Sequence, residues 1–512
     1  MRSRILMVAL LGASAGNALA EDKPVSVPVF DQRPLLDHVY DGGWEHFVGG
    51  GLAAFDCDGD AFPDLFAAGG ANPAKLLRNT TDLPGGELTF HDETPEVMRI
   101  TGVTGAYPLD VDGDGVLDLA ILRVGPDMLM RGKSKCAFEP FTDLGFTSGD
   151  HWTTAFSATW EEGESLPTLA FGTYVDRSDP DGPFEACDVT LLYRPKGGHY
   201  GEPLRLEPGF CALSMLFSDW SRTGKADLRV SNDRHYYVRG GQEQMWAMGA
   251  DPRLYTADDG WRSYSLWGMG IASRDLSGDG FPEVYLTSIG DQKFQAFDPA
   301  PGGPVWRDVT YDFGTTAHRP HTGEDGRPST GWHAAFGDVN TDGRDDIFVA
   351  KGNVEQMPDA AIEDPNTLLL QGQDGRFTEV AKEAGVASMA RSRGAALVDL
   401  NLDGALDIAV VNRRARMEVW QNAPPSGNWL KVWVSAPEPN TQAVGAFVEV
   451  RRSGGIQAQE ITVGGGHAGG AAVPLHFGLA TDEEVDVRVI WPGGASTEWR
   501  RIKANGEVKF EK

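Results

Sequence analysis

The sequence has little positive charge and no long apolar run beyond its first residues. Lys and Arg number 45 against 74 for Asp and Glu, the net charge is −29, and no basic stripe compensates. Such a surface repels nucleic acid phosphates and anionic lipid, so neither is expected as a partner. No later segment approaches the roughly 18 apolar residues that a membrane-spanning helix needs, so no membrane span is expected.

Motifs of the common enzyme classes are also missing. The chain has no GxSxG elbow, HExxH helix, phosphate-cradling glycine loop or dinucleotide fingerprint. His318 and His321, in HRPH, have metal-ligand character, but their Pro- and Gly-rich surroundings predict an exposed loop. His467 stands in a glycine run and is expected at the surface. These absences favour a protein that binds over one that catalyses.

The N-terminus has the features of a secretory signal peptide over residues 1–20. Arg2 and Arg4 precede the apolar run ILMVALLGASA, and Ala18-Leu19-Ala20 forms a small-residue cleavage site. We therefore expect an exported protein, either periplasmic or extracellular.

Cysteine is scarce, with four residues in the chain. In an exported protein they are expected to pair. Cys187 and Cys211 bracket a 23-residue loop and are the favoured pair, with Cys57–Cys136 as the remaining one, although three connectivities exist. None of the spacings indicates a zinc site.

One nine-residue pattern recurs along the chain. Oxygen-bearing side chains occupy loop positions 1, 3, 5 and 9, and an apolar, strand-like run follows each copy. The five clear copies are DCDGDAFPD from Asp56, DVDGDGVLD from Asp110, DLSGDGFPE from Asp275, DVNTDGRDD from Asp338 and DLNLDGALD from Asp399.

Acids this closely spaced repel one another, and a hard divalent cation relieves the repulsion. Ca²⁺ takes 6–8 oxygen ligands from carboxylates, amides and backbone carbonyls. An EF-hand is excluded, because position 12 is apolar in every copy where that motif needs Glu. We predict about five Ca²⁺ sites, with these side chains as ligands: Asp56, Asp58, Asp60, Asp64, Asp110, Asp112, Asp114, Asp118, Asp275, Ser277, Asp279, Glu283, Asp338, Asn340, Asp342, Asp346, Asp399, Asn401, Asp403 and Asp407.

The spacing of the repeats predicts the architecture. Weaker copies fit near Ala158 and Asp219, and the repeat then recurs about every 57 residues, close to the 40–50 of known propeller blades. With no helical periodicity between the repeats, we expect an all-β protein with a seven-bladed β-propeller and a small β-sandwich-like C-terminal domain. The expected divisions are a signal peptide over 1–20, an N-terminal segment over 21–42, the propeller over 43–424 and the C-terminal domain over 428–512.

These motifs resemble a known family. The loops are similar to the FG-GAP (VCBS-type) repeats of integrin-like propellers, and the segments NWLKVWV, AVGAFVEV, LHFGLA and VRVIWPGG resemble the ASPIC/UnbV domain. The combination is similar to bacterial relatives of cartilage acidic protein 1. The resemblance implies a calcium-binding propeller. Where such proteins often carry a polar or aromatic segment, this chain has GGGHAGGAAVP over residues 464–474.

A candidate ligand site lies six residues before position 1 of each loop, where the innermost strands of a propeller begin. These positions include large side chains where small ones would suffice. They could either rim a pocket at the mouth of the channel or fill the channel as core. The candidates are Trp152, Met269, Trp332, His333 and Arg393.

Three functions remain open on the sequence alone. The first is a recognition or adhesion module for an extracellular or periplasmic protein or glycan. The second is an enzyme or redox-partner protein with its site at the channel mouth, and the third is a structural scaffold.

Overall fold

The computed structural model describes residues 26–233, 239–300, 302–323, 325–355 and 357–512, so the predicted signal peptide lies outside the described residues. Strands dominate, and the α-helices within these ranges are the single turns α1 (Thr310–Phe313) and α2 (Ala381–Ala384). Short 3-10 helices are η1 (Trp44–His46), η2 (Glu96–Met98) and η3 (Ala257–Asp259). Within the described part, no helix is long and apolar enough to cross a membrane.

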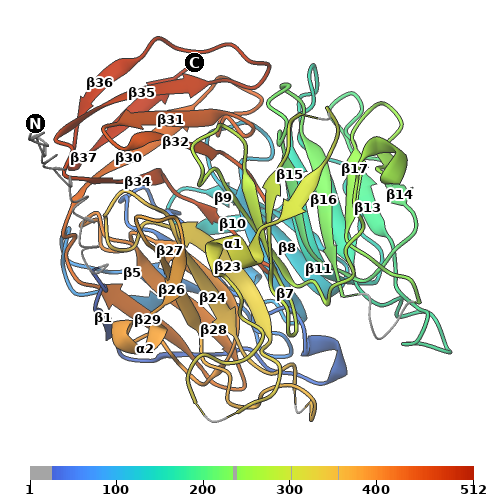
Figure 1. Ribbon diagram of the computed structural model, residues 1–512. Coiled ribbons are helices and arrows are strands. Elements are labelled where there is room, and N and C mark those ends of the chain that lie inside the picture. The colour runs from blue at the N-terminus through green and yellow to red at the C-terminus, as the bar shows by residue number, and fades with distance from the viewer. Residues whose placement is uncertain (1–25, 234–238, 301, 324, 356) are drawn as a thin grey trace, which may run out of the picture.

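The strands form successive four-stranded antiparallel sets, which we call blades (Figure 1). Within a blade, each strand pairs with the next along the chain. Six blades consist of β3 (Leu52–Phe55), β4 (Asp64–Ala67), β5 (Lys75–Asn79) and β6 (Phe90–Asp92); β7 (Val103–Leu109), β8 (Asp118–Gly125), β9 (Met128–Lys133) and β10 (Ala137–Pro140); β11 (His151–Thr159), β12 (Thr168–Thr173), β13 (Thr190–Tyr193) and β14 (Leu204–Leu206); β15 (Ala212–Ser218), β16 (Asp227–Asn232), β17 (Gln244–Ala247) and β18 (Arg253–Leu254); β19 (Gly270–Arg274), β20 (Glu283–Thr287), β21 (Lys293–Phe297) and β22 (Trp306–Asp308); β23 (Gly331–Gly337), β24 (Asp346–Lys351), β25 (Thr367–Gln371) and β26 (Phe377–Glu379).

A further blade contains both early and late parts of the chain. β27 (Arg391–Val398), β28 (Asp407–Arg413) and β29 (Arg416–Asn422) are completed by β1 (Phe30–Gln32) and β2 (Leu36–Val39), which both pair with β29. The propeller therefore starts before residue 43, because the N-terminal segment covers the edge of β29 that would otherwise be exposed.

The blades close into a ring. Their first strands contact one another in chain order, and β27 contacts β3. Buried Ala, Leu, Val and aromatic side chains fill the space between neighbouring blades. The all-β class and the propeller are thus confirmed.

The C-terminal domain packs two sheets against each other. One contains β34, β30 and β37, and the other contains β32, β31, β35 and β36. Both sheets contribute to one apolar core, with Leu430 and Phe477 from the first and Val448 and Val487 from the second. The strands are β30 (Asn428–Ser435), β31 (Phe447–Arg452), β32 (Gly455–Glu460), β34 (Leu475–Ala480), β35 (Glu484–Ile490), β36 (Arg500–Lys503) and β37 (Gly506–Glu511).

One strand of this region belongs to the propeller instead. β33 (Ala471–Ala472) pairs in parallel with β3.

Disulfides join Cys57 to Cys136 and Cys187 to Cys211, and the second is the pair that the sequence favoured.

Candidate functional site

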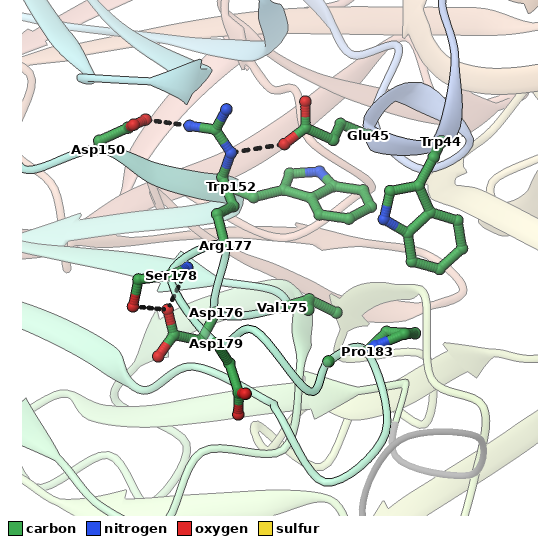
Figure 2. Close-up of a pocket in the computed structure, with 11 residues that line it drawn as sticks. Trp44, Glu45, Asp150, Trp152, Val175, Asp176, Arg177, Ser178, Asp179 and Pro183 are labelled. Atoms are coloured by element: carbon green, nitrogen blue, oxygen red, sulfur yellow. Dashed lines mark hydrogen bonds and ion pairs between the residues drawn. The ribbon is translucent and has the colours of Figure 1, made fainter.

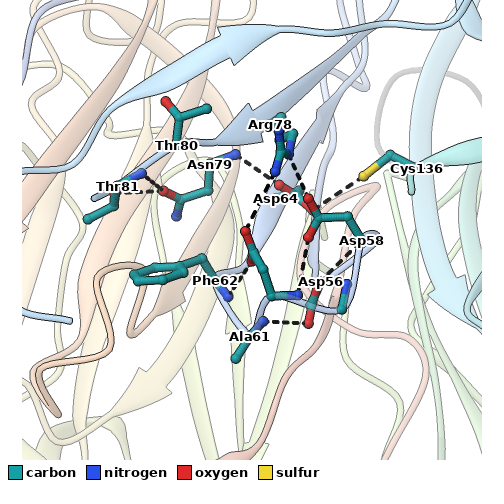
Figure 3. Close-up of polar contacts among 12 residues, drawn as sticks. Asp56, Asp58, Ala61, Phe62, Asp64, Arg78, Asn79, Thr80, Thr81 and Cys136 are labelled. Atoms are coloured by element: carbon teal, nitrogen blue, oxygen red, sulfur yellow. Dashed lines mark hydrogen bonds and ion pairs between the residues drawn. The ribbon is translucent and has the colours of Figure 1, made fainter. Parts of the chain in front are cut away.

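The five acidic loops each join the first strand of a blade to the second, so they gather at one end of the ring, which we call the loop end. In every loop the position-1 carboxylate accepts a hydrogen bond from the N–H of position 6. In the first loop these are Asp56 and Ala61, 2.8 Å apart (Figure 3). The other oxygen of this carboxylate also accepts a backbone N–H in every loop, so both oxygens organise the turn.

The position-9 carboxylate is a buried anchor in every loop. It accepts a hydrogen bond from the N–H of position 2, as in Cys57 N–H to Asp64 at 3.0 Å. Burial raises the pKa of Asp64 to about 7 and that of Asp118 to about 8. Burial likewise raises the pKa of Glu283 to about 7. The ionised position-9 carboxylates therefore need a further interaction, beyond these hydrogen bonds, to offset the cost of burying their charge.

Two loops bring three carboxylates within reach of one ion. Oxygens of Asp56, Asp58 and Asp64 lie within 4.8 Å of one another, and so do those of the corresponding residues in the second loop. The other three loops carry Ser277, Asn340 or Asn401 at position 3 and therefore offer a hydroxyl or amide oxygen there. A nearby cluster of Cys57, Cys136 and Asp64 cannot supply thiolates, because its sulfurs form a disulfide.

The second loop provides a specific test of whether an ion fits. Asp112 Oδ2 accepts a hydrogen bond from Arg131 Nε at 2.9 Å. The other carboxylate oxygen, Oδ1, is buried and has no hydrogen-bond partner in the described chain. In the first loop Arg78 Nε lies 2.6 Å from Asp58 Oδ2 (Figure 3). In each of these two loops one arginine offsets part of the negative charge, and the donor set of the second loop fits a hard cation.

The C-terminal domain covers the loop end. Lys431 Nζ lies 3.1 Å from Asp399 Oδ2, and both side chains are buried. The Thr441 hydroxyl donates to Asp110 Oδ2, and Gln457 donates to the Gly343 carbonyl at 3.1 Å. The domain therefore contacts oxygen atoms of three predicted metal loops, namely two carboxylate oxygens and one backbone carbonyl.

A segment of the same domain, residues 463–472, enters the channel of the propeller, and we call it the channel segment; with the inner strands and the C-terminal domain it lines a cavity of about 980 Å³. Backbone hydrogen bonds tie it to several inner strands, including Ala158 N–H to Val463 and Ala106 N–H to Ala468. Glycine on both sides makes this approach possible, because a Cβ at Gly51 or Gly105 would overlap the carbonyl oxygen of Ala468.

His467, predicted at the surface, is instead fully buried within the channel segment. Its Nδ1 lies 2.8 Å from the Met269 carbonyl, and its Nε2 faces the Gly49 N–H at 3.2 Å. Burial lowers the pKa of His467 to about 3, so the ring is neutral at pH 7. The prediction failed because composition shows a flexible glycine run but not the cavity into which it folds.

Of the predicted channel-mouth residues, Met269, Trp332 and His333 contact His467, and Arg393 contacts Trp332. The Trp332 ring lies edge-on to the His467 ring at 5.0 Å, and His333 Nδ1 accepts the His467 N–H at 3.1 Å. Arg393 stacks on Trp332 at 4.0 Å, and among the described residues it donates only to backbone carbonyls, including that of Val354 at 2.6 Å. These side chains face the channel segment.

β-Bulges explain how these side chains reach the channel. The pairing of β23 shifts register between Gly331 and Ala334, around Trp332 and His333. The pairing of β27 shifts between Ser392 and Ala395, around Arg393. A bulge re-aims a side chain away from the regular alternation of a strand.

Trp152 lies in the same buried cluster as Trp332 and Met269, at the end of the channel away from the loop end, which we call the open end. Its ring packs edge-on to Phe47 at 5.7 Å and to Trp44 at 5.8 Å. Trp44, on η1, is 52% exposed and separates two cavities of about 440 and 530 Å³. Figure 2 shows the first cavity, with Trp44 and Trp152 on one side and Arg177 beside them. Trp44 lies outside the repeat pattern, so that pattern could not mark it as a site residue.

The HRPH histidines, predicted in an exposed loop, are both exposed. His318 Nδ1 lies 3.0 Å from Asp291.

Comparisons with known proteins support the two-part organisation. Residues 56–121 and 338–410 match the model of the FG-GAP-like repeat, and residues 436–512 match the model of the ASPIC and UnbV family. The chain thus carries FG-GAP-like repeats and a C-terminal ASPIC/UnbV domain. No curated protein is significantly similar to the chain.

Solved structures are similar only at a distance. The BBS1N structure in complex with ARL6DN is 9% identical, covers 78% of this chain and 98% of its own, and has a TM-score of 0.43. Saccharomyces cerevisiae Sqt1 is 10% identical, with coverages of 78% and 99% and a TM-score of 0.41. An Agrocybe aegerita protein, described in terms of recognition of non-reducing terminal N-acetylglucosamine, is 16% identical, with coverages of 70% and 88% and a TM-score of 0.38. At these scores the likenesses support no conclusion about function.

Proposed function

We propose that this protein is an exported, calcium-stabilised propeller that acts as a recognition or adhesion module. Its repeats and its C-terminal domain both match families typical of protein-interaction modules. Its two disulfides suit an oxidising compartment, in agreement with the predicted signal peptide. The proposed partner is an extracellular or periplasmic protein or glycan.

The proposed calcium sites are the five acidic loops. The observation that carries this proposal is the second loop, where Asp112 clusters with the carboxylates of Asp110 and Asp118 and has a buried oxygen without a hydrogen-bond partner in the described chain. Ca²⁺ accepts irregular sets of oxygen ligands, whereas Mg²⁺ demands near-octahedral geometry and retains its waters. The mixed acid, amide and hydroxyl sets of the five loops therefore favour Ca²⁺.

The turn beginning at Asp219 provides an internal contrast. It has the same hydrogen bond from the position-6 N–H, from Gly224 to Asp219 at 2.7 Å. However, it carries Ser221 and Thr223 at positions 3 and 5, so only its ends are acidic. We propose that this turn folds without an ion and that the five acidic loops bind one each.

The open end is the proposed docking surface. The loop end is covered by the C-terminal domain, and the channel segment occupies the channel between the two ends. At the open end, by contrast, Trp44 is exposed between two cavities. An exposed aromatic beside concave surface is a common feature of binding sites.

Pull-down from a periplasmic extract and from culture medium, with the mature protein as bait, tests the recognition function. Calcium-loaded and EDTA-treated baits should be compared, because calcium is expected to hold the binding surface in its folded form. A partner retained only by the calcium-loaded bait is the expected result. Failure of both baits to retain any protein, together with an empty glycan array, would contradict the proposal.

A further inference from the structure

We infer that the open end holds a carbohydrate-binding site for a neutral oligosaccharide, centred on Trp44. The inference rests on the proposed recognition function and names its ligand class. The two cavities beside Trp44 would accommodate sugar units on either side of its indole.

Trp44 is presented as a fixed aromatic wall. Its ring centroid lies 4.9 Å from that of Phe47 and 5.8 Å from that of Trp152, and both of these neighbours are buried. Yet 52% of Trp44 remains exposed. The apolar C–H face of a sugar ring can pack on such an indole, and little side-chain freedom is lost on binding because Trp44 is already held in place.

The first cavity combines hydrogen-bond acceptors with donors. Its acidic residues are Glu45, Asp150, Asp176 and Asp179, and its cation is Arg177. Arg177 is held in position by Glu45 at 2.5 Å and by Asp150 (Figure 2). Sugar hydroxyls both donate and accept, so a polyhydroxylated ligand can use every group in this set.

Trp152 supplies the observation that points to a ligand. It is 1% exposed, it lines the first cavity, and its indole N–H has no hydrogen-bond partner among the residues that the structure describes. A buried donor without a partner is costly, so a ligand atom that accepts from it is favoured. A hydroxyl oxygen can be that acceptor.

The same groups argue against other ligand classes. A small amine would suit the carboxylates, but its ammonium group has no acceptor for the Trp152 N–H or for Arg177. An anionic glycan would be repelled by a protein whose net charge is −29. The cavities, of about 440 and 530 Å³, are in the range of small-ligand sites rather than flat protein interfaces.

The test uses the calcium-loaded full-length mature protein on an array of neutral oligosaccharides that includes cellotetraose, mannotetraose and chitotetraose. Heparin and oligolysine serve as the anionic and cationic probes. We expect retention of at least one neutral oligosaccharide and of neither charged probe. Binding of oligolysine alone, or of no glycan, would overturn the inference.

Variants locate the site. Trp44→Ala should weaken binding of the retained oligosaccharide by about tenfold or more, because loss of an aromatic anchor commonly has that effect. Trp152→Phe keeps the ring and removes the N–H, and should weaken binding by a smaller factor. Tyr311→Ala removes an even more exposed aromatic that lines neither cavity, and this variant should bind normally.

The melting temperature of each variant shows whether it is folded. Unchanged affinity in a folded Trp44→Ala protein would overturn the inference. If pull-down still captures a protein partner while no neutral glycan binds, the glycan site fails and the recognition function stands.

Discussion

The two ends of the propeller are both rich in carboxylates, but their carboxylates have different partners. At the loop end, Asp64 and Asp118 are buried and bind backbone N–H groups of their own blade. At the open end, Asp176 and Asp179 bind only their local turns and line a cavity. The hydrogen-bond partners of these acids, rather than their density, therefore distinguish the buried carboxylates that organise a blade from those that line the cavity at the open end.

Removal of calcium should have the largest effect and should act at the loop end. A ligand bound only to the folded state contributes about 2.7 kcal/mol per site at 100 times its Kd, so several sites add up. EDTA should lower the melting temperature, and Ca²⁺ should restore it better than Mg²⁺. An unchanged melting curve in EDTA would remove the basis for the calcium sites.

Trp332→Ala should be the most damaging of the single substitutions proposed here. Trp332 is fully buried against His467 and Arg393, and deletion of a buried Trp side chain costs about 3–5 kcal/mol. Denaturant unfolding measures the loss. Partner binding should survive in the folded fraction, whereas loss of binding with stability preserved would make Trp332 a ligand residue after all.

Gly51→Ala should separate the channel segment from the channel. The new methyl group would overlap the Ala468 carbonyl, and forced overpacking costs about 1–3 kcal/mol. Gly201→Ala is the matched control, because a Cβ there meets no atom within 4 Å. Equal stability of the two variants, measured by denaturant unfolding, would show that the channel segment is not tightly seated.

The smallest expected effect is a pH dependence of the folding stability, which arises from His151 at the open end. A hydrogen bond from His151 Nδ1 to Asp188, at 2.9 Å, raises the pKa of His151 above its usual value. The stabilisation from this hydrogen bond is therefore complete below the pKa of His151 in the unfolded chain. It is lost as the pH rises through the higher pKa of His151 in the folded protein. His151→Gln should remove about 0.5–1 kcal/mol at pH 5.5 and almost nothing at pH 8.5. A difference that does not change with pH would contradict this assignment.

Much of the loop end could be predicted from the sequence, because it depends on local spacing. Oxygen side chains at positions 1, 3, 5 and 9 predicted turns that lead into strands, and recurrence of the pattern predicted the propeller. The favoured pair Cys187–Cys211 also followed from proximity along the chain. Short-range periodicity determines these features, so they needed no knowledge of the ring.

Only the tertiary structure decided what occupies the channel and which end stays open. Val463–Ala472 reaches its partners on β3, β7 and β11 from more than 300 residues away along the chain, and no local pattern encodes that contact. Bulges then turn Trp332 and Arg393 toward the channel, against the regular alternation of a strand. Trp44 is exposed for the same reason: which surfaces are covered depends on how the C-terminal domain packs on the ring, and long-range packing determines that arrangement.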